Sequence, residues 1–320
     1  MKKIKSISSF SEGEKIQGFF LCVEKHLRYT RSGDLYIDIQ LRDITGHISG
    51  KIWDNVAELN KKFQAGNAVA VSGNVENFLD QSQLIIKKIN KATVQHYGRY
   101  GFDPAKIVPS SKKNPKKLWN DILIIIKSIK NPSLRKLVEM IYRSNKKKIM
   151  TRPASVRLNH NYRSGFLEHV FSMAQVTKKI CPMYNVNRDL VIAGVFLHGI
   201  GILKAINSEY EADNTLEGNL IGHVIIGRDM VRESIGKIKK FPLELSQKIE
   251  HIILCHPGPY KSISPQIPSF PEALLVHHIQ LMDSRMSLMN NSLEENQEDG
   301  NFTNRHNYFR IPLYKENEVK

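Results

Sequence analysis

Hydrophobic and polar residues alternate with a period of two in five short runs within the first ninety residues. The runs cover residues 17–23, 35–41, 47–53, 68–75 and 83–89. Such alternation is typical of strands with one buried face, so we expect five strands. Between the third and fourth runs, Val56, Leu59 and Phe63 have helical spacing. This spacing predicts a short helix over residues 54–63.

Five strands with a helix between the third and fourth are typical of an OB-fold, a barrel whose second and third strands often bind oligonucleotides. OB-folds hold single strands by stacking bases on exposed aromatic rings beside basic side chains. Two of the basic candidates, Arg28 and Arg31, lie in the expected loop between the first two strands. The full set of candidates is Arg28, Arg31, Tyr36, Lys51, Trp53 and Phe78. The alternative for each ring is a place in the barrel core.

Strand alternation ends near residue 101, and Pro104, Pro109 and Pro115 punctuate the polar stretch that follows. Apolar residues then recur three and four positions apart, which predicts helices over 118–130, 133–143, 165–180, 189–197, 219–235, 242–254 and 271–289. We therefore expect two domains, an all-β five-stranded OB barrel followed by an all-α domain. The predicted boundaries are 1–97 for a nucleic-acid-binding barrel, 98–117 for a basic linker, 118–290 for the helical domain and 291–320 for a polar tail.

Composition excludes several classes of protein. Hydrophobic residues make up 41% of the 320 and charged residues 24%, which is ordinary for a globular protein. Three scattered cysteines are too few for a disulfide framework, so we expect a cytoplasmic protein. No apolar stretch approaches the roughly 20 residues that a membrane-spanning helix needs, so we expect no membrane partner.

The net charge of +16 is concentrated in the middle of the chain. Residues 101–150 hold 13 lysines and arginines against 3 acidic residues. A concentrated basic segment attracts a polyanion through counterion release, so single-stranded RNA or DNA is the expected partner. The candidates for phosphate contacts are Lys112, Lys113, Lys116 and Lys117. The alternative is a solvated basic linker and helix surface.

Eight of the twelve histidines fall between residues 160 and 278. His169 shares a predicted helix face with Phe166, Val170 and Met173, so its imidazole should point inward. Three more occupy helix ends or starts: His198, His223 and His256. One inward histidine is more often a hydrogen-bonded core residue, whereas four together favour a shared metal site.

The order of these segments resembles that of HD-type phosphohydrolase domains. The matching segments are HNYRSGFLEH at 160–169, AGVFLHGIG at 193–201, GH at 222–223, HIILCHPG at 251–258 and PEALLVH at 271–277. With an OB-fold in front, nearly the whole chain resembles the YhaM-type 3′–5′ exoribonucleases. The resemblance implies two divalent metals, manganese in this family, that activate water to cut the terminal phosphodiester. His169, His198, His223 and His256 match ligand positions.

The chain departs from that family pattern at four chemically important positions. The aspartate of the defining His-Asp pair, which bridges both ions, is Gly199, and the lysine three positions later is Ile202. The second histidine of the His-His-Gly motif is Pro257, and the late aspartate of the final helix is Gln280. Asp283 matches a second aspartate, which we expect to lie outside the metal's direct ligands.

Without the bridging carboxylate, two ions should not bind together. One ion held by imidazoles would suit Zn²⁺ or Co²⁺ better than Mn²⁺, and no bound metal is a further alternative. The leading hypothesis is a single-stranded nucleic-acid-binding protein of this exoribonuclease family whose hydrolytic activity is lost or weakened. The alternatives are an active metal-dependent 3′–5′ exoribonuclease with an atypical site, and a nucleotide-sensing regulator.

Overall fold

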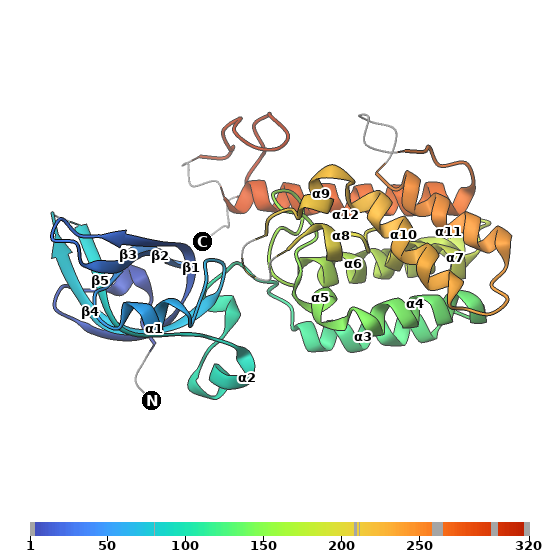
Figure 1. The fold of residues 1–320 in the computed structure, drawn as a ribbon. Helices are drawn as coiled ribbons and strands as arrows, with labels where there is room; N and C mark the ends of the chain where they lie inside the picture. The colour runs from blue at the N-terminus through green and yellow to red at the C-terminus, as the bar shows by residue number, and fades with distance from the viewer. Residues whose placement is uncertain are drawn as a thin grey trace. The chain divides into compact units, whose positions relative to one another are not determined.

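The computed structural model describes residues 4–79, 81–207, 210, 212–257, 265–295 and 300–316. The chain divides into two compact units, Met1–Ser110 and Ser111–Lys320. The first unit is a β-barrel and the second is helical (Figure 1). This confirms the predicted fold class of an all-β barrel followed by an all-α domain. Among the described helices, none is both long enough and apolar enough to cross a membrane.

The barrel closes in the order β1-β2-β3-β5-β4, with β3 and β5 parallel and the other neighbours antiparallel. The strands are β1 (Lys15–Tyr29), β2 (Leu35–Asp43), β3 (Gly46–Ile52), β4 (Ala68–Phe78) and β5 (Gln81–Lys91). In β2, the buried residues Ile37 and Ile39 alternate with the partly exposed Tyr36 and Asp38. Each predicted run therefore overlaps a strand, and most of its apolar positions face the barrel interior.

The first strand extends further than its hydrophobic pattern indicates. A bulge at Cys22/Glu24 bends β1, and the strand then continues to Tyr29, with Arg28 opposite Tyr36 of β2. The prediction that Arg28 lies in a loop was therefore wrong. Beyond the bulge β1 carries mostly exposed or half-exposed polar residues, so backbone pairing continues without an apolar alternation to reveal it. The helix expected over 54–63 is the shorter α1 (Val56–Asn60).

Short elements surround the barrel: η1 (Ile7–Ser9), α2 (Val94–Tyr97), η2 (Gly98–Tyr100) and η3 (Pro104–Lys106). Within this unit, Phe102, Ile107 and Val108 are buried. The segment after β5 therefore packs onto the barrel and is not free chain as far as residue 108.

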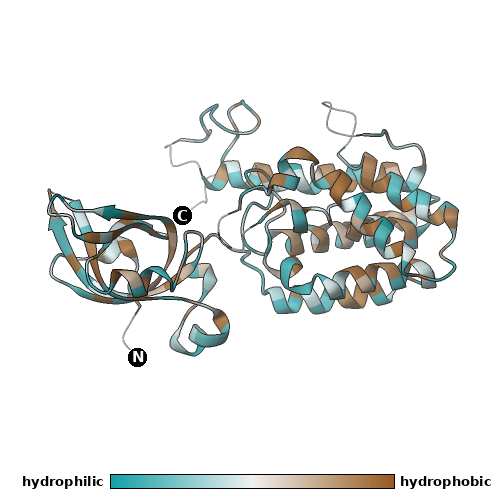
Figure 2. Ribbon diagram, in the orientation of Figure 1, coloured by the Kyte–Doolittle hydropathy of each residue, from teal (hydrophilic) through white to brown (hydrophobic). Residues whose placement is uncertain are grey.

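The second unit is a bundle around α7 (Arg188–Leu197), in which every residue from Leu190 to Leu197 is buried. This helix contacts α4, α6, α11 and α12. Figure 2 shows hydrophobic residues throughout these helices. The other helices are α3 (Pro115–Lys127), α4 (Pro132–Ser144), α5 (Lys146–Thr151), α6 (Gly165–Ile180), α8 (Ile202–Ala205), α9 (Leu216–Leu220), α10 (His223–Gly236), α11 (Leu243–Cys255) and α12 (Pro271–Glu294), with the 3-10 turn η4 (Cys181–Met183) after α6.

Asparagine caps fix where three of these helices begin. The side chains of Asn114, Asn131 and Asn187 accept backbone N–H bonds from the first turns of α3, α4 and α7. Proline follows at the first position of α3 and α4, where its missing N–H costs nothing.

Three features differ from the sequence expectation. The single helix expected over 219–235 is divided into α9 and α10 at Gly222, whose φ of 82° lies in the left-handed region. Helices α5 and α8 were not predicted, because four to six residues are too short for a periodic signal. The final helix continues to Glu294, and residues 300–316 then form a loop in which Thr303 and Leu313 are buried.

Candidate functional site

The helices bring the four predicted histidines together inside the second unit. His169 lies on α6, His198 and His256 cap the C-terminal ends of α7 and α11, and His223 is the first residue of α10. Their rings form a row. The ring centroids are 5.3 Å apart for His169 and His198, 5.0 Å for His198 and His256, and 5.8 Å for His256 and His223. Residues more than eighty positions apart thus form one cluster.

Hydrogen bonds fix the tautomer of two of these rings. His198 Nδ1 lies 2.7 Å from the carbonyl oxygen of Val195, and His256 Nδ1 lies 2.6 Å from that of Ile253. A carbonyl only accepts, so Nδ1 must donate in each ring, and in a neutral ring Nε2 keeps its lone pair. Burial lowers the pKa of His198 to about 3 and holds the pKa of His256 well below its ordinary value. Both rings are therefore neutral at pH 7.

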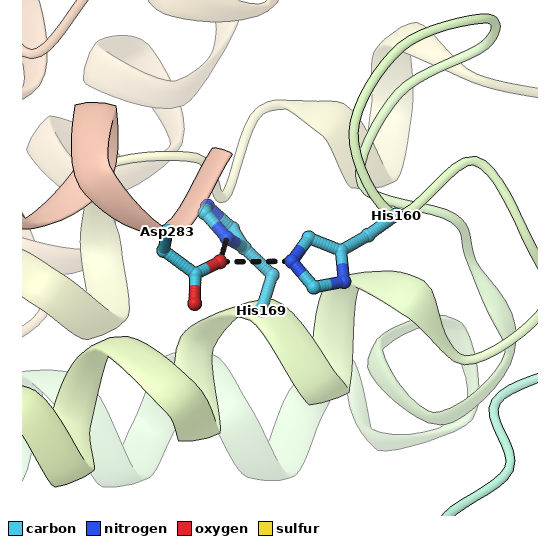
Figure 3. A group of neighbouring side chains, drawn as sticks. All are labelled: His160, His169 and Asp283. Carbon is cyan, nitrogen blue, oxygen red and sulfur yellow. Dashed lines mark hydrogen bonds and ion pairs between the residues drawn. The ribbon is translucent and has the colours of Figure 1, made fainter. Parts of the chain in front are cut away.

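Asp283 of α12 joins His169 to His160, which lies in the loop before α6 (Figure 3). Its Oδ2 accepts from His169 Nδ1 at 2.6 Å and from His160 Nε2 at 2.8 Å. Burial would raise the pKa of the Asp283 carboxyl, but these two hydrogen bonds outweigh it and hold that pKa below its usual range. The carboxylate thus orients the His169 ring and leaves Nε2 facing the cluster.

The network continues from His160 toward the surface. His160 Nδ1 lies 2.9 Å from the Tyr162 hydroxyl, which donates to Glu168 at 3.1 Å. Glu168 also accepts from the Ser111 hydroxyl at 2.6 Å and pairs with Lys113 at 3.0 Å. Burial would raise the pKa of Glu168, but these partners lower it. The chain of contacts links a lysine of the predicted basic segment to the buried histidines.

Sequence reasoning did not identify His160 as a partner of Asp283. The two residues are 123 positions apart, and no spacing rule connects a loop to a distant helix. The sequence offered only one indication of a role for His160, which is its place as the first residue of the HNYRSGFLEH segment. His160, His169 and Asp283 form a group whose ligand atoms all lie within 4.8 Å of one another. The hydrogen bonds described above already occupy the facing atoms of this group.

The nitrogen pair between His169 and His198 fits a single metal ion better. The two Nε2 atoms are 3.3 Å apart, although each ring places its N–H on Nδ1. Two lone pairs therefore face each other. Two imidazole nitrogens on one tetrahedral zinc ion, each about 2.0–2.1 Å from it, are about 3.3–3.4 Å apart. This donor pair fits one ion that favours imidazole.

Position 199 carries no carboxylate, and its surroundings are apolar. Gly199 is buried in the turn after α7. A Cβ on Gly199 would lie 3.3 Å from a ring carbon of Phe166 and 3.5 Å from the Cδ1 of Ile202. Both neighbours are buried hydrophobic residues. The residues present here do not fit a two-metal centre bridged from position 199.

Gln280 and Pro257 add no carboxylate or imidazole to the cluster. The Gln280 amide donates to the Ser284 hydroxyl on the same helix at 3.1 Å. Pro257 directly follows His256, and the next residue, Gly258, lies outside the described residues.

On the barrel, four of the predicted nucleic-acid-binding residues form two pairs, one joined through Asp38 and one stacked, which meet where Lys51 Nζ lies 5.7 Å from the Tyr36 ring centroid. Arg28 pairs with Asp38 at 3.0 Å and Lys51 pairs with it at 2.6 Å. Tyr36 and Trp53 stack with centroids 4.6 Å apart, and 45% of Trp53 is exposed. Tyr36 and Trp53 are therefore outside the core, on the face formed by β2 and β3.

The remaining basic candidates lie elsewhere. Arg31 is exposed in the turn between β1 and β2. Lys112 pairs with Glu294 at 3.0 Å, whereas Lys116 and Lys117 are exposed in the first turn of α3. Within the part of the chain that the structure describes, neither of these two lysines has an acidic partner.

Comparison with known proteins agrees with this two-part architecture. The HD domain family matches residues 166–285, and the family described as an OB-fold nucleic acid binding domain matches residues 21–92. A relative, the 3′–5′ exoribonuclease YhaM from Oceanobacillus iheyensis, is 29% identical over 318 residues and spans 96% of both chains.

Among solved structures, the second OB-fold domain of replication protein A from Methanococcus maripaludis is 20% identical. The match covers 27% of this chain and 92% of that chain, with a TM-score of 0.23. A replication protein A heterotrimer bound to ssDNA is 14% identical over 30% of this chain and 69% of that chain, with a TM-score of 0.23. At these TM-scores the likeness carries no functional argument. The chain is therefore similar over 96% of its length to a YhaM 3′–5′ exoribonuclease, and it contains an OB-fold domain followed by an HD domain.

Proposed function

We propose that this protein binds single-stranded RNA through its OB-fold domain and that its HD domain hydrolyses RNA weakly or not at all. The observation that supports the second part is Gly199 itself, which has no side chain to bridge two ions and whose Cβ position is bordered by the apolar side chains of Phe166 and Ile202. RNA is the proposed ligand because the full-length relative is named an exoribonuclease. A cytoplasmic location is in keeping with its three free, buried cysteines.

Electrostatics explains why the missing carboxylate matters. In two-metal sites the ions are about 3.5–4 Å apart and stabilise both the attacking and the leaving oxygen. A shared anionic ligand offsets the repulsion between two dications at that distance. Neutral imidazoles coordinate an ion but bring no negative charge. The Oδ2 atom of Asp283 accepts hydrogen bonds from His160 and His169, so this oxygen orients the two rings.

One observation favours the binding of a single metal ion. The Nε2 atoms of His169 and His198 face each other. These two residues would hold the ion, and Asp283 would keep the His169 ring oriented through Nδ1. Zn²⁺ and Co²⁺ suit imidazole ligands. When bound, such an ion polarises a phosphoryl oxygen and lowers the pKa of a bound water. The second candidate function is therefore a mononuclear phosphodiesterase acting on RNA 3′ ends.

Incubation of the purified protein with 5′-labelled single-stranded RNA separates the two candidates. Mn²⁺, Mg²⁺, Co²⁺ and Zn²⁺ are supplied in parallel, and binding is measured on the same RNA. We expect binding without shortening from the 3′ end. A ladder with Co²⁺ or Zn²⁺ that His198→Gln abolishes would establish the second candidate. A ladder with Mn²⁺ would contradict the loss of the two-metal centre.

Restoring the family residues tests the assignment of the altered positions. The variant carries Gly199→Asp, Ile202→Lys, Pro257→His and Gln280→Asp, and elemental analysis measures its metal content after dialysis against Mn²⁺. We expect bound manganese to rise above that of the wild-type protein. Unchanged manganese content in a folded variant would show that these positions do not correspond to the family's metal site.

Binding through the β2–β3 face is tested with Trp53→Ala. A base stacked on an aromatic side chain contributes about 1–3 kcal/mol, so RNA affinity should fall at least fivefold. Tyr184→Ala is the matched control, because Tyr184 is also an exposed ring but lies in the helical unit. Equal affinities for both variants would exclude Trp53 as a stacking platform.

A further inference from the structure

We propose a second site for single-stranded RNA on the barrel, in a groove formed by β1, β4, β5 and residues 94–100. This groove is separate from the Tyr36 and Trp53 pair on β2 and β3. The inference rests on the proposed RNA binding and names a further surface that carries it. It concerns the first unit alone.

The strand register creates the hollow. On the outer face, Phe19 of β1 lies opposite Ala70 of β4, which lies opposite Asn90 of β5. In the next row, Gln17 lies opposite Ser72, which lies opposite Lys88. The small side chains of the central strand thus stand between larger ones on both sides. The result is a hollow of about 770 Å³, within the size range of ligand sites.

Aromatic rings form one wall of this hollow. The Phe19 and Tyr97 ring centroids are 5.8 Å apart at an interplanar angle of 73°, and those of Tyr97 and Tyr100 are 6.2 Å apart. Phe19 also contacts the buried ring of Phe102, at 5.1 Å between centroids. Tyr100 remains 55% exposed. An exposed ring beside rings fixed by packing offers a stacking surface for a base.

Local hydrogen bonds hold the wall in place. The Thr93 side chain caps α2 by accepting from the backbone N–H of His96. Gly101 takes a φ of 89°, and Phe102 then donates its N–H to the Tyr97 carbonyl at 3.1 Å. A glycine is needed at this turn because that φ is strained for other residues. The wall is therefore preorganised, which reduces the entropy lost when a ligand binds.

The positive charge of the groove favours an anionic ligand. Lys88 and Arg99 line the groove together with the amides of Gln17 and Asn90, and no carboxylate is among the described residues that line it. The Arg99 guanidinium lies 4.8 Å from the Tyr100 ring centroid. Within the described part of the chain, neither Lys88 nor Arg99 has an acidic partner, whereas Asp38 pairs with both Arg28 and Lys51 on the β2–β3 face. Stacking rings, amides and unpaired cations together match the bases and phosphates of a single strand.

Photocrosslinking locates the contact independently of affinity. The full-length protein is irradiated with single-stranded RNA that contains 4-thiouridine at every third position, and crosslinked peptides are identified by mass spectrometry. We expect crosslinks both to the Trp53 region and to residues 94–100. Crosslinks confined to the β2–β3 face would overturn the proposal.

Paired variants measure what the groove contributes. Tyr100→Ala with Lys88→Gln should weaken binding of a 20-nucleotide RNA about tenfold or more, and Lys61→Gln with Tyr184→Ala is the control matched in charge and ring count. Circular dichroism verifies the fold, which should be kept because Tyr100 and Lys88 are exposed.

The outcomes separate this inference from the proposed function. If Trp53→Ala weakens binding while Tyr100→Ala with Lys88→Gln does not, the groove is excluded and RNA binding stands. If the wild-type protein binds no RNA, both fail. If the groove variant and Trp53→Ala each weaken binding, two faces of the barrel contact the strand.

Discussion

Gly199 has apolar surroundings that do not favour an added polar side chain. Its missing Cβ would contact Phe166 and Ile202, both buried. Gly199→Asp therefore places a carboxylate against apolar groups, and we expect it to lower the free energy of unfolding by about 2–4 kcal/mol. Urea denaturation measures this loss. Gly199→Ala is the control, since its methyl group is only slightly crowded and should cost about 1 kcal/mol or less. Equal effects would show that the pocket accepts a carboxylate.

The sequence was sufficient to find most residues of the cluster. Spacing and helix position indicated His169, His198, His223 and His256, and the structure brings all four together. It did not indicate that Asp283 joins His160 to His169, nor that Lys113 reaches Glu168. These partners depend on how a loop and the connector fold over α6. A contact between a loop residue and a residue distant in the chain cannot be predicted from the hydrophobic pattern of a single sequence.

At the scale of elements, the break between α9 and α10 determines where His223 lies. Gly222 has a φ of 82° with no atom within 4 Å of an added Cβ, so only backbone strain opposes Gly222→Ala. We expect a loss of about 1–2 kcal/mol in the free energy of unfolding. Gly236→Ala is the control within α10, since its Cβ also meets nothing, its φ is not positive and alanine favours helix. Thermal denaturation should show the two changes with opposite signs.

This break also shows a limit of helical periodicity. A glycine inside a periodic segment is tolerated at about 1 kcal/mol, so the pattern over 219–235 did not distinguish a continuous helix from two helices. The barrel strands were easier to predict because a buried interior requires alternation along every strand. Beyond the bulge in β1 the residues no longer alternate between buried and exposed, so the predicted strand ended before the observed one.

For the whole molecule, the neutral histidines imply sensitivity to acid. Burial lowers the pKa of four of them: His169, His198, His223 and His256. Below pH of about 6.5 the unfolded chain binds protons at these residues, while the folded chain does so only at lower pH. Stability should therefore be complete above pH 7 and fall as the pH decreases, by up to about 1.4 kcal/mol per pH unit for each histidine.

Urea denaturation between pH 7.5 and pH 4.5 measures this slope in the metal-free protein. His198→Gln should make it shallower, because the pKa of His198 is lowered to about 3 and its neutral form is required throughout this range. His278→Gln is the control, since it removes an exposed histidine of α12 that lies outside the cluster. A slope that neither variant changes would mean that the buried cluster does not govern acid stability.

The contribution of the basic segment to RNA binding is measured on the whole molecule, because counterion release depends on the total number of phosphate contacts. Lys112 and Lys113 already pair with Glu294 and Glu168, whereas Lys116 and Lys117 have no acidic partner among the described residues. Lys116→Gln with Lys117→Gln should therefore reduce the salt dependence of RNA binding more than Lys112→Gln with Lys113→Gln does. Each lost phosphate contact should decrease the slope of log K against log salt by about 0.7 for a single strand.

Fluorescence anisotropy between 50 and 300 mM KCl measures both slopes. Equal slopes in the two variants and the wild-type protein would show that this segment connects the two units without contacting RNA.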